Sequence, residues 1–188
     1  MFFYAIIIAI LIGYGLKGKL KNINNIELDW LYLVFIGFFI DITMQLLGRY
    51  GILKIGIATY IIDVIMYILI FTFVYKNKRD FSVILIGIGA MLNAIPIFSN
   101  GGTMPVSKHI MDSLIKNYTP TNDGLYSVMT NGSNFKILCD RMYIKIMGPG
   151  IFSIGDIVIA IGMMLIIILG MTSGNSKGLY KNQVEKIL

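Results

Sequence analysis

The sequence contains one cysteine, Cys139, and one histidine, His109. A single thiol cannot form an intrachain disulfide, and one thiol with one imidazole cannot build a thiolate zinc cluster or a histidine-rich metal site. Charged residues make up only 14% of the 188 residues, whereas soluble domains contain about 25%. A soluble fold of this length would lack the polar side chains to cover its surface, so these scarcities exclude an ordinary soluble domain.

Long hydrophobic runs are what the chain has in abundance, and 56% of its residues are apolar. A helix needs about 20 mostly apolar residues to cross a bilayer. We therefore predict an all-α fold, a single membrane domain over residues 1–188 that forms a polytopic transmembrane helix bundle of about five spans. The predicted spans are 2–16, 30–47, 55–75, 81–98 and 151–171.

The segment between the last two runs, residues 99–150, is predicted to be a long extracytoplasmic loop. From Val106 to Tyr118 its apolar residues recur every three or four positions, which favours a short amphipathic helix on the membrane surface. Residues 135–147 are apolar with interspersed charges, which indicates either a second surface helix or a strand. The loop is thus expected to hold one or two surface helices.

The basic residues indicate which way the chain crosses the membrane. Segments 17–29, 76–80 and 172–188 carry three Lys or Arg each, and short basic segments tend to stay in the cytoplasm. This distribution predicts a multipass protein of the cell membrane with its N-terminus outside and its C-terminus in the cytoplasm. The net charge of +6 is not arranged as a basic stripe interleaved with aromatics, so nucleic acid is not an expected partner.

Polar side chains interrupt four of the predicted spans. An aspartate at mid-helix costs about 2.5–3.5 kcal/mol on insertion scales, and intramembrane ionisable residues are functional by default. Asp41 and Gln45 share one face of the second span, Asp63 lies in the third, Asn93 in the fourth, and Asp156 opens the fifth. The predicted topology puts them all in the outer half of the membrane, beneath the long loop.

A purely structural explanation exists for the same residues. Small residues on these faces allow close helix packing, and polar side chains beside them can join helices by hydrogen bonds. In the first span Ala5, Ala9 and Gly13 form such a face. Ser153 and Asp156 also have the spacing of a capping box, with Ser153 as N-cap and Asp156 at the third helical position.

Two short motifs resemble those of a known family. Asn100–Ser107 (NGGTMPVS) follows the fourth span, and Phe152–Asp156 (FSIGD) opens the fifth. Together they resemble a bacterial multipass membrane-protein family of the domain-of-unknown-function type, and we expect the resemblance to cover the whole chain. It implies the same topology and no particular activity. The Asn100-Gly-Gly turn could cradle an anion with its backbone N–H groups, or be the tight exit from the fourth span.

These residues predict an outward-facing polar pocket that binds a small polar or cationic ligand or a lipid headgroup. The expected role is transport-accessory, binding or sensing, together with the lipid bilayer and a membrane partner protein. The expected ligand-binding residues are Asp41, Gln45, Asp63, Asn93, Asn100 and Asp156.

A membrane-embedded enzyme acting on a lipid or peptide is the alternative. Its chemistry would come from acid–base work by Asp41 and Asp63, or from a nucleophilic pair formed by Cys139 and His109. A hard, oxygen-preferring cation held by Asp41, Asp63 and Asp156 is a further alternative. Nothing in the sequence indicates a cofactor.

Overall fold

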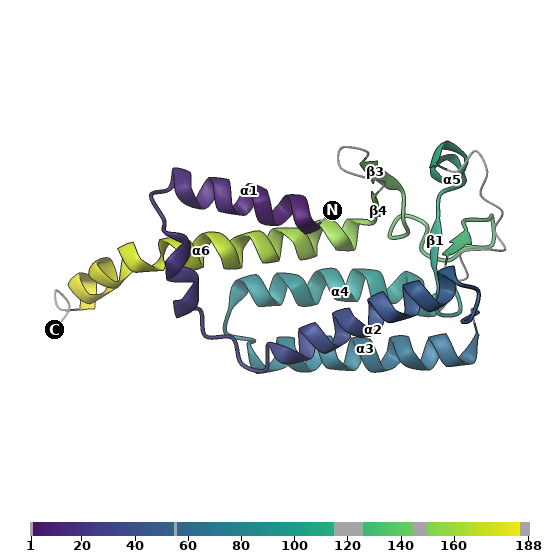
Figure 1. Cartoon of the computed structure of the whole chain (residues 1–188), viewed down its shortest axis with the longest axis horizontal. Coiled ribbons are helices and arrows are strands. Elements are labelled where there is room, and N and C mark those ends of the chain that lie inside the picture. The colour runs from purple at the N-terminus through teal and green to yellow at the C-terminus, as the bar shows by residue number, and fades with distance from the viewer. Residues whose placement is uncertain (1, 55, 115–125, 145–149, 185–188) are drawn as a thin grey trace.

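The computed structural model describes residues 2–54, 56–114, 126–144 and 150–184. The described residues are mostly helical (Figure 1). In chain order the elements are α1 (Phe2–Gly15), the 3₁₀ helix η1 (Leu20–Asn25), α2 (Tyr32–Arg49), α3 (Ile57–Lys76), α4 (Phe81–Ser99), β1 (Met104–Val106), α5 (Lys108–Leu114), β2 (Tyr126–Val128), β3 (Met142–Ile144), β4 (Gly150–Phe152) and α6 (Ile154–Val184).

Three helices are long and apolar enough to cross a membrane. They are α3, α4 and the Ile154–Ser173 part of α6, while α1 and α2 are shorter apolar helices. These five helices all begin within a few residues of the start of a predicted span, and most of them also end within a few residues of its end. The largest difference is in α6, whose helix continues to Val184 instead of ending near residue 171.

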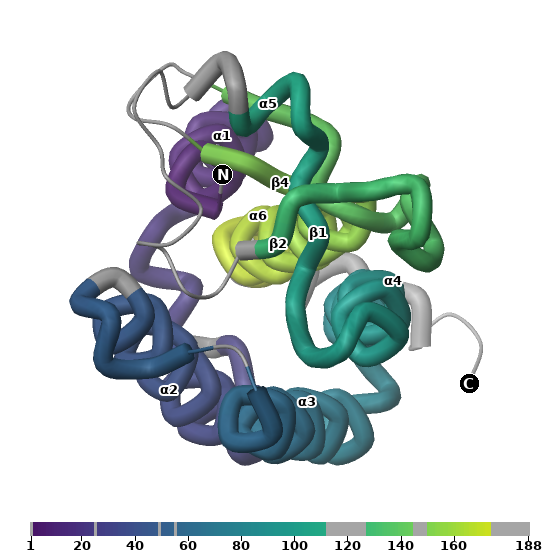
Figure 2. The backbone as a smooth tube through the Cα atoms, turned by 90° about the vertical axis from the view of Figure 1, so that its right-hand side faces the viewer, coloured from purple at the N-terminus to yellow at the C-terminus, as the bar shows by residue number. Residues whose placement is uncertain are grey.

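The five apolar helices are arranged as an open arc. Each helix packs on the next in the order α1, α6, α4, α3, α2, and the α4–α6 pair has the most extensive contact. Viewed end-on, α1 and α2 form the two ends of this arc (Figure 2). Among the described residues no extensive contact joins α1 to α2, so the bundle is not closed.

The predicted small-residue face holds α1 on α6. Ala5, Ala9 and Gly13 are the buried residues of α1, and a Cβ at Gly13 would collide with the side chain of Met171. The end of α1 is also tied down, because the Met171 carbonyl accepts hydrogen bonds from Lys19 N (2.9 Å) and from Asn22 Nδ2 (2.8 Å). The opposite end of α1 lies beside the start of α6 (Figure 1).

Aromatic rings join α3 to α4. The ring of Phe98 on α4 makes edge-to-face contacts with Tyr60 and Tyr67 of α3, each with 5.3 Å between centroids. Tyr67 is also packed in a buried cluster with Ala90 and Ala94. These contacts fix the ring of Tyr67 between the two helices.

The long loop contains β-structure that the all-α prediction omits. Strand β1 pairs in parallel with β2, and β3 pairs antiparallel with β4. The helix α5 lies within the predicted amphipathic segment, and residues 142–144 of the second segment form a strand. Val106, Ile110 and Met111 make a small buried core for the loop. The described part of the loop is therefore folded, and it lies at one end of the bundle (Figure 1).

Candidate functional site

Asn93, Ser153 and Asp156 form a closed hydrogen-bond network where α4 meets the start of α6. Asn93 Nδ2 donates to Asp156 Oδ1 (2.9 Å), and Ser153 Oγ donates to Asn93 Oδ1 (2.7 Å). The capping box is confirmed, because Ser153 N donates to Asp156 Oδ2 (2.8 Å) and Asp156 N donates to Ser153 Oγ (3.1 Å). Both polar atoms of the Asn93 amide are used inside the protein, so Asn93 positions Asp156.

Two glycines allow the helices to approach closely beside this network. A Cβ at Gly155 would collide with the Asn93 amide oxygen and lie 2.7 Å from the Gly89 carbonyl oxygen. A Cβ at Gly89 would lie 2.6 Å from the Gly155 carbonyl oxygen. Any side chain at either position would separate α4 from α6, so these glycines are needed for the Asn93–Asp156 contact.

Asp41 lies on α2 one helical turn after Gly37, where a Cβ would be 3.7 Å from Met66 of α3. Gln45 Nε2, one helical turn further on, donates to Asp41 Oδ2 (2.8 Å). The Asp41 carboxylate also lies within electrostatic range of Asp156 on α6 and of Asp63 on α3. Carboxylates on three separate helices therefore lie close enough to interact electrostatically.

Asp63 and Tyr67 are one turn apart on α3, and neither side chain makes a hydrogen bond within the described part of the chain. Asp63 is half-buried. The Tyr67 side chain is only 7% exposed, and it feels the charges of Asp63, Asp156 and Asp41. No fully buried side-chain oxygen of the described residues lacks a partner, so the Tyr67 ring is buried while its hydroxyl oxygen stays accessible. Tyr67 thus offers a free donor beside three carboxylates.

Asp140 belongs to the same region, although the sequence reasoning did not include it in the pocket. Its backbone is fixed against the loop strand β1, since Asp140 N donates to the Pro105 carbonyl (3.1 Å) and Ser107 N donates to the Asp140 carbonyl (2.9 Å). Its side chain is 7% exposed and, among the described residues, has no hydrogen-bond partner. Burial, and then the charge of Asp156, raise the pKa of the Asp140 carboxyl to about 7.

We call Asp41, Asp63, Asp140 and Asp156 the acidic cluster. Each interacts electrostatically with at least one other member. No Lys or Arg forms a salt bridge with any of them within the described ranges, so the cluster has no internal counter-ion. No three acidic, His or Cys side chains of the described residues are close enough to share a metal ion.

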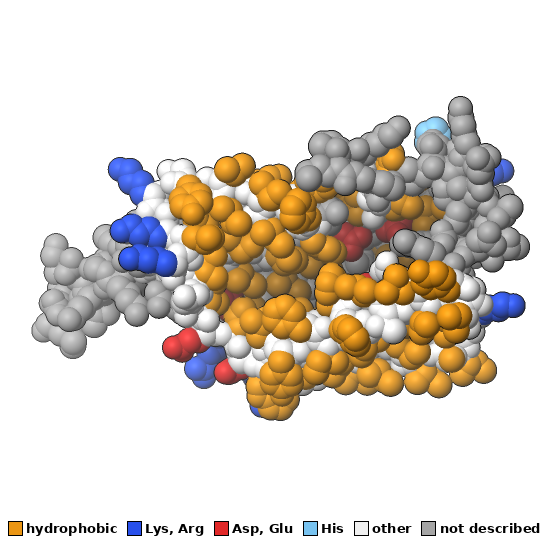
Figure 3. Space-filling view, in the orientation of Figure 1, with side chains coloured by type: hydrophobic (Ala, Val, Ile, Leu, Met, Phe, Trp, Pro, Cys, Tyr) orange, Lys and Arg blue, Asp and Glu red, His pale blue; other side chains and the backbone are white. Residues whose placement is uncertain are grey.

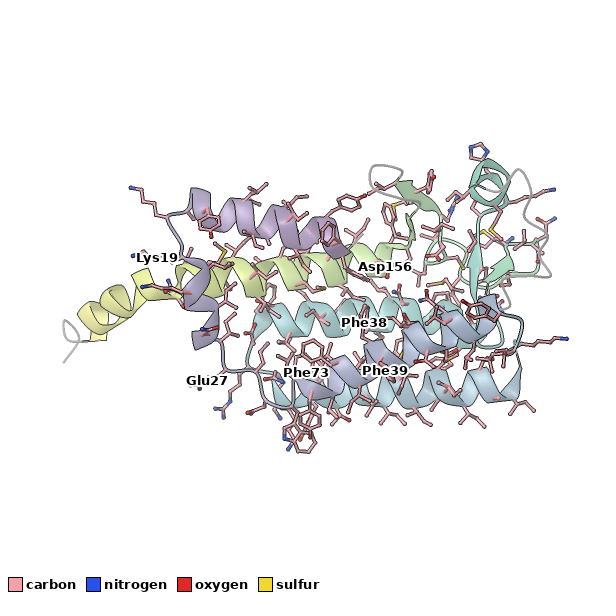
Figure 4. All side chains as sticks on the ribbon, viewed as in Figure 1. Lys19, Glu27, Phe38, Phe39, Phe73 and Asp156 are labelled. Atoms are coloured by element: carbon pink, nitrogen blue, oxygen red, sulfur yellow. The ribbon has the colours of Figure 1, made fainter. Side chains whose placement is uncertain are left out.

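A furrow separates the α1/α6 side of the bundle from α2, and we use this name for the recessed surface between them. The space-filling view shows acidic side chains recessed in the half of the furrow nearer the loop, and hydrophobic side chains over both of its walls (Figure 3). Asp156 lies at this end of α6, whereas Lys19 and Glu27 lie at the opposite end of the bundle (Figure 4). The acidic cluster is therefore at the loop end and reachable from the side.

The Asn100 side chain hydrogen-bonds to the end of α4 and to the loop, and not to the acidic cluster. Its Nδ2 donates to the Pro96 carbonyl (2.7 Å) and to the Asn134 carbonyl (3.1 Å), and its Oδ1 accepts from Asn134 N (2.8 Å). Gly101 and Gly102 have φ of +77° and +82°, and Gly102 N donates to the Ile97 carbonyl (2.9 Å). This is a Schellman C-cap, so the motif ends α4 and anchors the loop.

Cys139 and His109 do not form a catalytic pair. The Cys139 thiol is buried and donates to the Asn134 and Phe135 carbonyls, at 3.6 and 3.5 Å. Burial, and then the nearby Asp140 charge, raise the pKa of the Cys139 thiol, whereas a nucleophilic cysteine needs a lowered one. His109 is exposed on α5 and makes no hydrogen bond to this thiol. The geometry gives no support to thiol chemistry.

Comparison with known families gives one match. A family model described as a family of unknown function (DUF5317) matches residues 25–168. The match confirms the resemblance seen in the two motifs, but it leaves α1 and the end of α6 outside, where the sequence reasoning expected the whole chain to be covered. Neither the curated proteins nor the solved structures give a match.

Proposed function

Because the chain belongs to DUF5317, a family of unknown function, its role must be read from its own geometry, and we propose that it is a five-span membrane protein with a binding pocket for a small organic cation. The pocket is built around the acidic cluster in the outer half of the membrane. The protein binds or senses the ligand, or presents it to a transport partner.

The five-span topology rests on helix direction and charge. Helices α1, α3 and α6 run one way through the bundle, and α2 and α4 run the other way (Figure 1). The basic segments after α1 and α3 are then at one end, which the positive-inside rule assigns to the cytoplasm. The 14 residues of α1 cover about 21 Å, less than the ~30 Å hydrocarbon core. Its packing along the longer α6 keeps it at membrane depth.

The depth of the acids supports an outward-facing pocket. Asp63 lies six residues after Ile57, and Asp41 eight residues before Arg49. At 1.5 Å per residue these separations are about 9 and 12 Å along the helices. Asp156 lies two residues after the start of α6. All three depths are measured from the loop end, which the topology puts outside.

The observation that carries the proposal is a set of polar side chains that lack hydrogen-bond partners and lie near several carboxylates. Asp63, Asp140 and Tyr67 have no hydrogen bond within the described residues, and the charges that shift their ionisation come from other aspartates. Uncompensated charge is expensive in a low-dielectric site. A bound ammonium would supply both the counter-charge and the missing donors.

The test uses ethanolamine as a water-soluble probe on the full chain in detergent. Binding to the folded protein raises its unfolding temperature with concentration, and we expect this rise for the native protein but not for Asp63→Asn. Asp29→Asn is the matched control, because Asp29 is exposed and follows η1 at the opposite end of the bundle. Absence of a rise in the native protein, or an equal rise in Asp63→Asn, overturns the proposal.

A further inference from the structure

The acidic cluster is open toward the side of the bundle as well as toward its end. The furrow runs along the bundle between α1 and α2, and it continues past the acidic side chains to the opposite end (Figure 3). Among the described residues no extensive contact between α1 and α2 closes it. A pocket for a soluble ligand needs only an opening to water, whereas this one also opens to the surface that faces lipid.

The face of α2 that carries the acid continues as an apolar wall. Phe38, Asp41 and Gln45 are spaced three and four residues apart and so share one face of the helix. Phe38 is 60% exposed, and it is labelled on α2 in Figure 4. One continuous surface therefore offers a carboxylate near the loop and an aromatic ring deeper in the membrane.

A furrow at this depth is filled by lipid chains. The hydrocarbon core supplies no water to occupy an apolar space, and an empty space forfeits the dispersion contacts of its walls. A lipid whose chain lies along the furrow has its headgroup at the loop end, beside Asp156, and its headgroup reaches Asp63 and Asp41 when the lipid sits about 9–12 Å deeper than its neighbours in the leaflet. The lipid that gains most there is one whose headgroup matches unpaired carboxylates.

The hydrogen-bond requirements of the cluster select the type of headgroup. The carboxyl groups of Asp63 and Asp140 can accept hydrogen bonds from a donor, and the Tyr67 hydroxyl can also accept a hydrogen bond. A primary ammonium carries three N–H donors, while a quaternary ammonium carries none. The exposed Arg141 follows Asp140 in the loop at the same end of the bundle and offers a cation for the phosphate of such a lipid. The chemistry thus favours a primary amine over a choline headgroup.

We propose that the furrow binds a membrane lipid with a primary-amine headgroup, which enters sideways between α1 and α2 and places its ammonium in the acidic cluster. This inference rests on the proposed cation pocket and names its ligand class. The acyl chain lies against the apolar walls, and Asp41 and Asp63 contact the ammonium.

The test is lipid competition. The full chain is reconstituted into nanodiscs with equal amounts of phosphatidylethanolamine, phosphatidylcholine and phosphatidylglycerol, released into mild detergent, and analysed for retained lipid by native mass spectrometry. We expect at least fivefold enrichment of phosphatidylethanolamine over phosphatidylcholine. Asp63→Asn should return the ratio to that of the bilayer, and Asp29→Asn should keep the native enrichment.

The possible results separate the two proposals. Lipid ratios equal to the bilayer, with ethanolamine still stabilising the native protein but not Asp63→Asn, overturn the lipid inference and leave the cation pocket intact. Failure of both the lipid and the ethanolamine arms overturns both proposals. Enrichment that persists in Asp63→Asn also overturns the inference, because the carboxylates would then not be what recognises the headgroup.

Discussion

Replacing Asp140 by asparagine should stabilise the protein, and more so as the pH rises. The pKa of the carboxyl is raised from 3.8 to about 7 in the folded protein, and at about 1.4 kcal/mol per pKa unit the full shift is worth about 4 kcal/mol. Between these two values the unfolded chain has lost the proton while the native protein keeps it. The contribution of the Asp140 carboxyl to the free energy of unfolding therefore falls as the pH rises from 4 to 7.

An asparagine cannot ionise, so the variant escapes this loss. We expect Asp140→Asn to be more stable than the native protein by about 2 kcal/mol at pH 5 and about 4 kcal/mol at pH 8. At about 2–4 °C per kcal/mol for a chain of this length, the gain in unfolding temperature should grow by roughly 4–8 °C between the two pH values. Scanning fluorimetry in detergent measures it, with Asp29→Asn as the exposed control. A pH-independent gain, or a loss at pH 8, would refute the reasoning.

Three further predictions test the packing around the pocket. Gly155→Ala should lower stability by about 1–3 kcal/mol through overpacking against Asn93; Gly15→Ala, where a Cβ meets nothing within 4 Å, should change unfolding temperature little, and equal effects would contradict the close contact. Cys139 should resist a water-soluble maleimide until the chain is denatured, and rapid labelling of the folded protein would show that it is accessible. Asn100→Ala should cost about 1–3 kcal/mol by removing three hydrogen bonds, yet leave the ethanolamine response unchanged; loss of that response would make Asn100 part of the site.

The parts of the fold that the sequence predicted depend on local patterns. Long hydrophobic runs located the five long helices, small-residue spacing identified the α1 face, and the Ser153–Asp156 spacing predicted the capping box. The loop strands could not be predicted in the same way. Each has three residues, too few for an alternating pattern, and β1 pairs with β2 across more than twenty residues.

The candidate site was predictable in proportion to how local its contacts are. Asp41 and Gln45 bond one turn apart on the same helix, so their spacing was informative. Asn93 and Asp156 are 63 residues apart, and only the packing of α4 on α6 brings them together. Asp140 was missed because its burial depends on the loop pairing with β1. A sequence pattern shows which face a residue occupies but not which distant residue faces it.

The way α1 is fastened has a mechanical consequence for the pocket. Its attachment runs along the helix, because Ala5, Ala9 and Gly13 are all buried, and Lys19 ties the following residues to Met171. Helix α1 therefore moves together with α6 and not separately from it. A change in the width of the furrow would have to come from α2, which is held at the other end of the arc by α3.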